Sequence, residues 1–550
     1  MMASAIGAGQ KAPMAGNFCQ GDKLDMRNTL TGIAAALFAT TMLVGAASAE
    51  TLRWARQSDA LTLDPHSQNQ GVTHTFNHHI YETLLDRDVE GNLQARLATD
   101  WYVKEGDETV WVFELREGVT FHGGEEFTAE DVVFSIERAK SENSNMRQLH
   151  ADVESVAAVD DYTVEFQMAG PSPLYPNNIT NTFIMDKGWS EENDLTEVQD
   201  FAAGEENFAV RNTNGTGPYV LAERDPDVRS VLTVNEDWWG ETPAVTEIVY
   251  TPISDNATRV AALLSGEVDL VQDVPVQDIE RLAGTDGVKV ETGPENRTIY
   301  FGYAMDDEPL ISSNVTDENP FANPLVREAM SLVIDRDAIR QVVMRGQSLP
   351  TCVNMPPFVN GWTEELDTCP AVDVERATEL MAEAGYPDGF SVTLDTPNDR
   401  YVNDEAISQA FVGMLGQIGI DVTLASRPVA QHSPLILNNE TDFYLLGWGV
   451  PTFDSAYNFN DLVHTKDDEY GTYNIGLYSN PEVDEMIESL GTMTDLEARN
   501  GVIADIWAQV QEDRVFIPVH NQVLAYAMRD DMTLAVHPEN QPSMTGVVFE

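Results

Sequence analysis

The sequence predicts a mixed α/β protein built from more than one domain, and three observations support this. Strand-like apolar runs alternate with amphipathic helical patterns along the chain, without a repeat of fixed period. Some helical patterns end in a glycine followed by a short β-branched run, as at Gly419 and residues 420–424. About 500 residues follow the leader, more than one hydrophobic core normally serves, so two or three domains are expected.

The first 49 residues have the order of a secretory signal peptide. Arg27 precedes an apolar run at residues 30–44, and residues 47–49 (Ala-Ser-Ala) supply a small-residue cleavage site. The apolar run is too short for a membrane span. The polar residues ahead of Met26 are unusual in a signal and favour Met26 as the true start. We therefore expect a soluble, exported, periplasmic protein.

The charge balance excludes two classes of partner. With 91 acidic and 31 basic residues the net charge is -60, which repels nucleic acid and anionic lipid. A solvated acidic surface suits salty surroundings, where screening mutes self-repulsion, and says nothing about a ligand.

Two cysteines remain after the leader, Cys352 and Cys369. In an oxidising compartment this spacing predicts one disulfide, and two buried free thiols are the alternative.

The strand and helix patterns can be placed along the mature chain. Strands are predicted at residues 51–55, 110–115, 163–168, 230–234, 247–252, 298–303, 391–394, 421–425 and 442–447. Helices are predicted at residues 72–84, 129–140, 256–265, 324–334, 336–343, 373–384, 405–418, 481–489 and 496–512.

Residues 118–139 place His122 among several carboxylates, which raises the question of a metal site. The HExxH spacing is absent, whereas Thr128 stands at a helix N-cap and Asp131 at its third position. The pattern favours a structural turn and helix over metal binding.

A series of short motifs runs along the mature chain. They are residues 63–65 (LDP), 81–84 (YETL), 118–139, 215–219 (GTGPY), 235–240 (NEDWWG), 259–269, 326–329 (VREA), 334–336 (IDR), 384–386 (AGY) and 418–420 (IGI). The series resembles the large extracytoplasmic solute-binding proteins of ABC importers, family 5, which capture dipeptides, oligopeptides and, in some branches, nickel complexes or sugars. The motifs occur in the family's order and span nearly the whole mature chain.

The resemblance implies a periplasmic-binding-protein-like α/β fold, with two lobes joined by a hinge and an inserted extra domain. Lobe I would comprise residues 50–85, 215–295 and 520–550; the extra domain, residues 86–214; and lobe II, residues 296–519. The chain crossings near residues 295 and 520 would form the hinge.

The segment from Gly447 to Asp454 is the first candidate for a ligand contact. Gly447 and Gly449 flank Trp448, which allows a ligand close to the backbone and offers a flat surface with an N–H donor. A core aromatic is the alternative for Trp448. The resemblance implies acidic residues shortly after this motif, and Asp454 stands at the later position, where a helix or turn cap is the alternative. Pro451 stands at the earlier one, so an unmodified peptide amine would lack its usual partner.

Two further candidates lie elsewhere. Arg400, on a loop between a strand and a helix, can hold a carboxylate with two parallel hydrogen bonds, and a surface arginine paired with a neighbouring aspartate is the alternative. The resemblance makes Thr73 and His74 plausible contacts from lobe I. His74 and His78 have a spacing that permits a metal, but no adjacent cysteine or carboxylate completes a first shell.

The predicted function is the periplasmic binding component of an ABC importer that captures a di- or oligopeptide or a similar small solute. We expect a monomer that delivers the solute to the membrane permease, with no cofactor and no catalytic residue. The alternatives are the same fold with a sugar or metal complex, or a secreted hydrolase. The sequence has no GxSxG, HExxH, P-loop or paired CxxC motif, which disfavours the hydrolase.

Overall fold

The computed structural model describes residues 50–201, 203–398, 400–467 and 470–550. The predicted signal peptide, its cleavage site and the alternative start at Met26 lie outside these residues. None of the helices in the described ranges combines the length and the apolar character needed to cross a bilayer.

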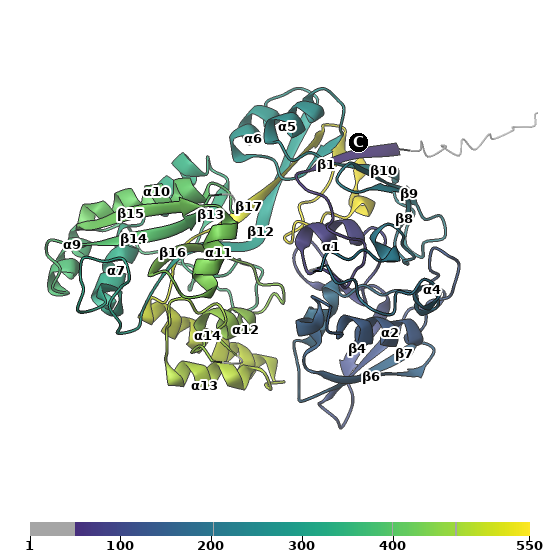
Figure 1. The fold of residues 1–550 in the computed structure, drawn as a ribbon, viewed down its shortest axis with the longest axis horizontal. Coiled ribbons are helices and arrows are strands. Elements are labelled where there is room, and N and C mark those ends of the chain that lie inside the picture. The colour runs from purple at the N-terminus through teal and green to yellow at the C-terminus, as the bar shows by residue number, and fades with distance from the viewer. Residues whose placement is uncertain (1–49, 202, 399, 468–469) are drawn as a thin grey trace, which may run out of the picture. The chain divides into compact units, whose positions relative to one another are not determined.

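One mixed sheet of 11 strands carries most of the fold, which confirms the predicted α/β class (Figure 1). Its strand order is β15-β14-β16-β12-β17-β11-β1-β10-β9-β8, and β13 pairs with β17. The strands are β1 (Glu50–Arg56), β8 (Tyr219–Asp225), β9 (Arg229–Val234), β10 (Val245–Pro252), β11 (Leu270–Val271), β12 (Val288–Tyr303), β13 (Ser348–Pro350), β14 (Phe390–Pro397), β15 (Ile420–Arg427), β16 (Phe443–Trp448) and β17 (Ile517–Arg529).

The long strands β12 and β17 connect the two parts of this sheet. They pair antiparallel from Val288 opposite Arg529 to Phe301 opposite Ile517. The first half of β17 also pairs with β13, its end pairs with β11, and the end of β12 pairs with β16. The register shifts between Pro294 and Thr298, so the regular pairing is interrupted close to the predicted hinge, which stays a prediction.

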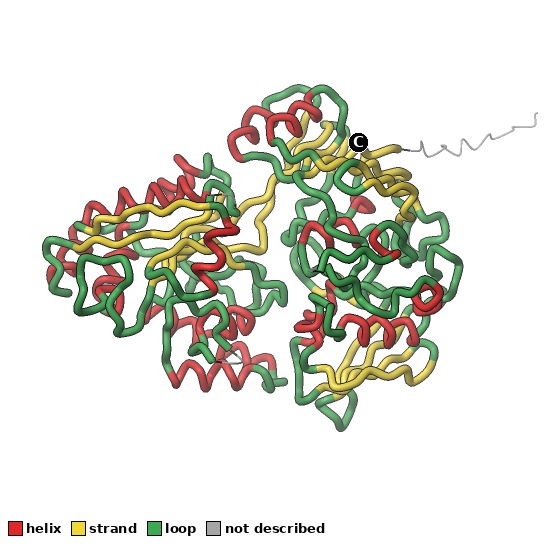
Figure 2. The backbone as a smooth tube through the Cα atoms, in the orientation of Figure 1, coloured by secondary structure: helices red, strands yellow, loops and turns green. Residues whose placement is uncertain are grey.

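A separate antiparallel sheet, with strand order β4-β5-β7-β6, lies in the predicted extra domain. Its hydrophobic core includes Phe113, Phe166 and Ile136, the last of these from α2, and Figure 2 shows the helix beside the strands. The elements here are β2 (Leu85–Arg87), β3 (Leu93–Ala95), β4 (Ala98–Val103), β5 (Val110–Leu115), α2 (Ala129–Ala139), β6 (Val153–Asp160), β7 (Thr163–Met168), α3 (Tyr175–Asn178) and α4 (Lys187–Glu192).

His122 and the start of α2 are parts of this framework. The Thr128 backbone N–H donates to Asp131 Oδ2 over 2.9 Å, and the two residues form a capping box at the start of α2. The hydrogen-bond partners of His122 are backbone carbonyls. Its backbone N–H donates to the Gly215 carbonyl, and its Nε2 lies 3.0 Å from the Gly217 carbonyl oxygen. His122 therefore ties the turn before α2 to residues 215–217.

The remaining helices lie elsewhere in the described chain. They are α1 (Gly71–Asn77), α5 (Asn256–Leu264), α6 (Val276–Ala283), α7 (Pro324–Val333), α8 (Arg336–Ala338), α9 (Val374–Glu383), α10 (Asp404–Leu415), α11 (Val429–Leu437), α12 (Ser455–Asn458), α13 (Pro481–Leu490) and α14 (Leu496–Asp513). Shorter pieces complete the fold at β18 (Met532–Thr533) and β19 (Val548–Phe549).

The predicted helix at residues 72–84 is wrong in its second half, because α1 ends at Asn77. The carbonyls of His79 and Ile80 accept hydrogen bonds from the N–H groups of Tyr219 and Gly217 instead of continuing a helix. His78 and His79 therefore lie in the turn after α1, and not on the helix with His74.

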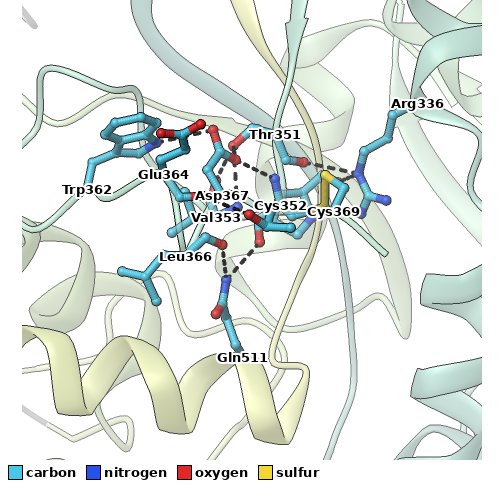
Figure 3. The surroundings of a disulfide bond; sticks show 12 residues. Arg336, Thr351, Cys352, Val353, Trp362, Glu364, Leu366, Asp367, Cys369 and Gln511 are labelled. Carbon is cyan, nitrogen blue, oxygen red and sulfur yellow. Dashed lines mark hydrogen bonds between the residues drawn. A yellow bond between two sulfur atoms is a disulfide. The ribbon is translucent and has the colours of Figure 1, made fainter. Parts of the chain in front are cut away.

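The predicted disulfide joins Cys352 and Cys369, whose Cα atoms lie 5.3 Å apart (Figure 3). Asp367 organises the bridged loop: its Oδ1 accepts from the Thr351 hydroxyl and the Cys352 N–H, and its Oδ2 from the Trp362 indole. Gln511, from α14, donates to the Leu366 carbonyl over 2.6 Å. The covalent bridge thus closes the loop, and the hydrogen bond from Gln511 attaches it to α14.

Candidate ligand-binding site

A cavity of about 450 Å³ brings together most of the predicted contact residues. Predicted lobe I contributes Gly71, His74 and the segment 538–541, and Asn181 comes from the predicted extra domain. Predicted lobe II contributes Arg400 and Tyr401 from the loop after β14, the end of β16, part of α11, and Tyr457 with Tyr473. Residues 295–297, in the irregular part of β12, lie between these groups in the sequence and line the cavity as well. The volume is in the range of small-molecule sites.

Gly447 and Gly449 are glycines because other parts of the protein approach them closely. A Cβ atom on Gly447 would lie 2.6 Å from the Tyr401 ring and 2.7 Å from the Ile299 side chain. A Cβ atom on Gly449 would lie 2.7 Å from the Asn296 carbonyl oxygen. Both glycines line the cavity, so close approach of a ligand to their backbone stays a prediction, and the space that a Cβ atom would occupy is taken by protein.

Trp448 forms an aromatic wall of the cavity with Tyr457 and Tyr473. Its ring stacks on Tyr457 with centroids 5.7 Å apart and lies 4.9 Å from the Tyr473 ring. The same side chain packs against two hydrophobic clusters of lobe II. Trp448 is therefore both a core residue and part of the cavity wall. Its Nε1 has no hydrogen-bond partner among the described residues.

Arg400 is an exposed side chain in the cavity lining, where it follows β14. Its backbone N–H donates to Asp404 Oδ2 over 3.1 Å, and its guanidinium lies 5.3 Å from the centroid of the Tyr401 ring. No carboxylate within the described ranges lies at ion-pair distance from this guanidinium; neighbouring Asp399 is outside those ranges. The guanidinium can thus donate hydrogen bonds to an anionic group of a ligand.

The irregular part of β12 supplies cavity residues that sequence reasoning missed. Arg297 Nε lies 3.2 Å from Glu295 Oε1, and Gln522 donates to the other oxygen of Glu295. Burial acts to lower the pKa of Arg297, but the Glu295 carboxylate outweighs this and raises it. Arg297 and Glu295 therefore form an ion pair within the cavity lining.

Asn296 holds the two walls of the cavity in place. Its side chain donates to the Val450 carbonyl over 2.8 Å and accepts from the Val450 N–H over 3.1 Å. Its backbone N–H donates to the Pro538 carbonyl over 2.7 Å. One residue thus connects the loop after Trp448 with the C-terminal segment.

Glu539 is a half-buried carboxylate on the lobe I side of the cavity. Its segment is attached near α1, since the Thr75 hydroxyl donates to the Asn540 carbonyl and the Met544 N–H donates to His79 Nε2. Burial raises the pKa of Glu539, against the opposing influence of His537, Arg87 and a hydrogen bond from Asn181.

His74 and Thr73 have different roles. His74 lines the cavity, and its Nε2 lies 3.0 Å from Asn69 Oδ1. Burial lowers the pKa of His74 to about 3, so the ring is neutral at pH 7 and Nε2 is the donor to the amide oxygen. Thr73 is buried outside the lining, where its hydroxyl accepts from the Leu61 N–H. Thr73 thus holds the chain before α1 in position, and a contact with a ligand stays a prediction.

Asp454 also lies outside the cavity lining. Its two carboxylate oxygens accept from the guanidinium of Arg499, and Oδ1 also accepts from the Ala456 N–H at the start of α12. These contacts correspond to the cap alternative for Asp454. Pro451, in contrast, lines the cavity.

A second cavity of about 470 Å³ adjoins the first. The two share Asn69, Asn181, Pro451 and Tyr457 in their linings. The second cavity is formed by the extra domain and by α13 with its surroundings, and several asparagines line it.

Comparisons with known proteins agree on one family. The model of bacterial extracellular solute-binding proteins, family 5 Middle, matches residues 92–470. The glutathione-binding protein GsiB of Pectobacterium atrosepticum is 27% identical over 480 residues, which cover 86% of this chain and 88% of the relative.

Solved structures share the fold. HbpA2 from Haemophilus parasuis superposes with a TM-score of 0.78 at 20% identity, covering 91% of this chain and 100% of the other. The dipeptide-binding protein from Pseudoalteromonas sp. SM9913, in complex with Met-Leu, has a TM-score of 0.72 at 22% identity, with 91% and 100% covered. These likenesses confirm the predicted fold class.

Proposed function

The chain belongs to the bacterial extracellular solute-binding proteins of family 5, and from this membership we propose that it captures a short peptide or peptide-like solute with a free carboxylate. Its relatives include glutathione-binding proteins, and solved structures that share its fold hold peptides. The chain is therefore a substrate-binding component of an ABC importer. We propose that the solute of this chain is a peptide.

The observation that carries this proposal is the Arg400 guanidinium in the cavity lining. It has no ion pair within the described ranges, whereas Arg297 in the same cavity is paired with Glu295. A guanidinium offers two parallel N–H donors that match a carboxylate. The aromatic wall of Trp448, Tyr457 and Tyr473 supplies a large apolar contact surface beside it.

Capture would need contacts from both lobes. A ligand shifts an equilibrium between open and closed states only by its differential affinity for the closed one. The lining draws on Gly71 and His74 from lobe I and on Arg400 and Trp448 from lobe II, so a small solute can touch both. The proposal includes export by the signal at residues 26–49, function as a monomer, delivery to a permease and no catalysis.

Calorimetric titration with a panel of Met-Leu, Ala-Ala-Ala, glutathione, glucose and the nickel–histidine complex tests the proposal. We expect at least one peptide to bind, to be recovered intact, and to bind more weakly once its C-terminus is amidated. Binding of only the sugar or the nickel complex would contradict the peptide assignment. Hydrolysis of any member would support the secreted enzyme instead.

A further inference from the structure

The cavity carries charges of opposite sign on its two lobes. We propose that Glu539 holds the ammonium group of a zwitterionic solute while Arg400 holds its carboxylate, so that one small molecule bridges lobe I and lobe II. This inference rests on the proposed function and adds the group that recognises the positive end of the solute.

Glu539 is the acidic residue of the lining whose charge is not already used. The structure places two carboxylates in this lining, Glu295 and Glu539. Glu295 is bound by Arg297 and Gln522. No cation in the described part of the chain lies within ion-pair distance of Glu539. Its neighbours there are the Asn181 amide and the more distant charges of His537, Arg87 and Asp86, the last of these negative. A carboxylate half removed from water, without a paired cation, favours an added cation at this place.

The surroundings of Glu539 keep it in position. The Pro538 carbonyl accepts from the Asn296 N–H, and the Asn540 carbonyl accepts from the Thr75 hydroxyl and the Gln272 amide. The Asn540 side chain donates to Asp273 Oδ1 over 2.8 Å and accepts from Gln272. The residues on both sides of Glu539 are thus fixed to β12, α1 and the strand region near β11, and the carboxylate is held by a rigid segment.

Among the described lining residues, the loop opposite Glu539 contributes no competing anion. Residues 449–451 are Gly, Val and Pro, and they present no ionisable side chain to the cavity. Arg400 lies on this lobe II side, in the loop between β14 and α10. A zwitterion would therefore have one preferred direction, with its ammonium toward lobe I and its carboxylate toward lobe II.

A peptide series combined with two variants tests this assignment. Met-Leu and Ala-Ala-Ala are titrated unmodified, N-acetylated and C-amidated into wild type, Glu539→Gln and Arg400→Gln. We expect Glu539→Gln to weaken the unmodified peptide by about tenfold or more and to leave the N-acetylated form within about twofold of wild type. Arg400→Gln should show the complementary pattern, with the C-amidated form insensitive.

The matched control is Glu379→Gln, because Glu379 is an exposed carboxylate on α9 that pairs with Arg376 and lies outside both cavities. Thermal unfolding of each variant checks that the fold is intact. An equal loss for unmodified and N-acetylated peptide, or no loss for either, would overturn the role of Glu539 while leaving peptide capture standing. Failure of wild type to bind any form would overturn the proposed function and this inference with it.

Discussion

The carboxylate of Asp454 accepts two hydrogen bonds of 2.7 Å from the guanidinium of Arg499, and both side chains are buried. The pair connects the start of α12, directly after the cavity loop, to α14. The aspartate that the family pattern indicated for a ligand is thus bound within the protein.

Breaking this pair should destabilise the protein strongly. Arg499→Leu leaves the Asp454 charge buried without its partner, and we expect the free energy of unfolding to fall by about 3–5 kcal/mol. Urea unfolding measures it, with Arg376→Leu in an exposed pair as the control, for which a loss below about 1 kcal/mol is expected. Equal losses in the two variants would show that the buried pair has no special weight.

Truncation of the aromatic wall should weaken solute binding. Trp448→Ala removes the ring that stacks on Tyr457 and lines the cavity, and we expect affinity for a binding peptide to fall more than about tenfold by calorimetry. Trp111→Ala, which removes a half-buried tryptophan of the extra domain, is the matched control. An unchanged dissociation constant in Trp448→Ala would remove the wall from the site.

Loss of the Arg400 guanidinium should weaken the binding of carboxylate-bearing solutes selectively. Arg400→Ala is expected to weaken carboxylate-bearing solutes by about tenfold or more while leaving C-amidated peptides nearly unaffected. Arg376→Ala, on the exposed face of α9, controls for a change in net charge. A similar loss for both ligand classes would indicate a structural role for Arg400.

Buried histidines should make the fold sensitive to mild acid. Burial lowers the pKa of His520 to about 3, so the unfolded chain takes up its proton first as the pH falls below about 6.5, and stability is lost. Between pH 7 and pH 5 one such histidine costs about 2 kcal/mol of unfolding free energy. We expect His520→Gln to reduce the measured difference between these two pH values by about that amount. An unchanged difference would mean that the folded protein protonates His520 as readily as the unfolded chain does.

The disulfide should contribute measurably to stability. Cys352 and Cys369 are separated by 17 residues, and a loop of this length predicts about 3 kcal/mol in the chain-entropy model. The double variant Cys352→Ser with Cys369→Ser, unfolded in urea under oxidising conditions, measures this contribution. Equal stability with and without the cysteines would assign the loop's order to Asp367 and Gln511 instead.

The sequence predicted elements where local pattern and packing agree. Strands β5 and β7 coincide with their predictions, because each alternates or clusters apolar residues on the inserted domain's own core. Helix α2 begins where the Thr128 cap was expected.

Strand β17, one of the two central strands, was missed for a physical reason. It contains Pro518, His520, Asn521 and Gln522, which are uncommon in a strand interior. Two of these side chains find partners on the neighbouring strand β12: the Thr298 hydroxyl donates to Asn521, and Gln522 donates to Glu295. Such partners come from distant parts of the chain and leave no local pattern.

Only part of the site was predicted, because the other residues reach the cavity through contacts between distant parts of the chain. Trp448, Arg400 and His74 carry local signals, and the structure gathers them in one cavity. Glu295, Arg297 and Glu539 reach that cavity only through the pairing of β12 and the attachment of the C-terminal segment. An Asn between two opposite charges at residues 295–297 was the one local signal for the first pair.

Small-angle X-ray scattering during titration with a peptide that binds tests directly whether a small solute is enclosed between two lobes. We expect the radius of gyration to fall in proportion to occupancy, with the peptide recovered intact. A constant radius of gyration at saturation, together with cleavage of the peptide, would contradict this expectation.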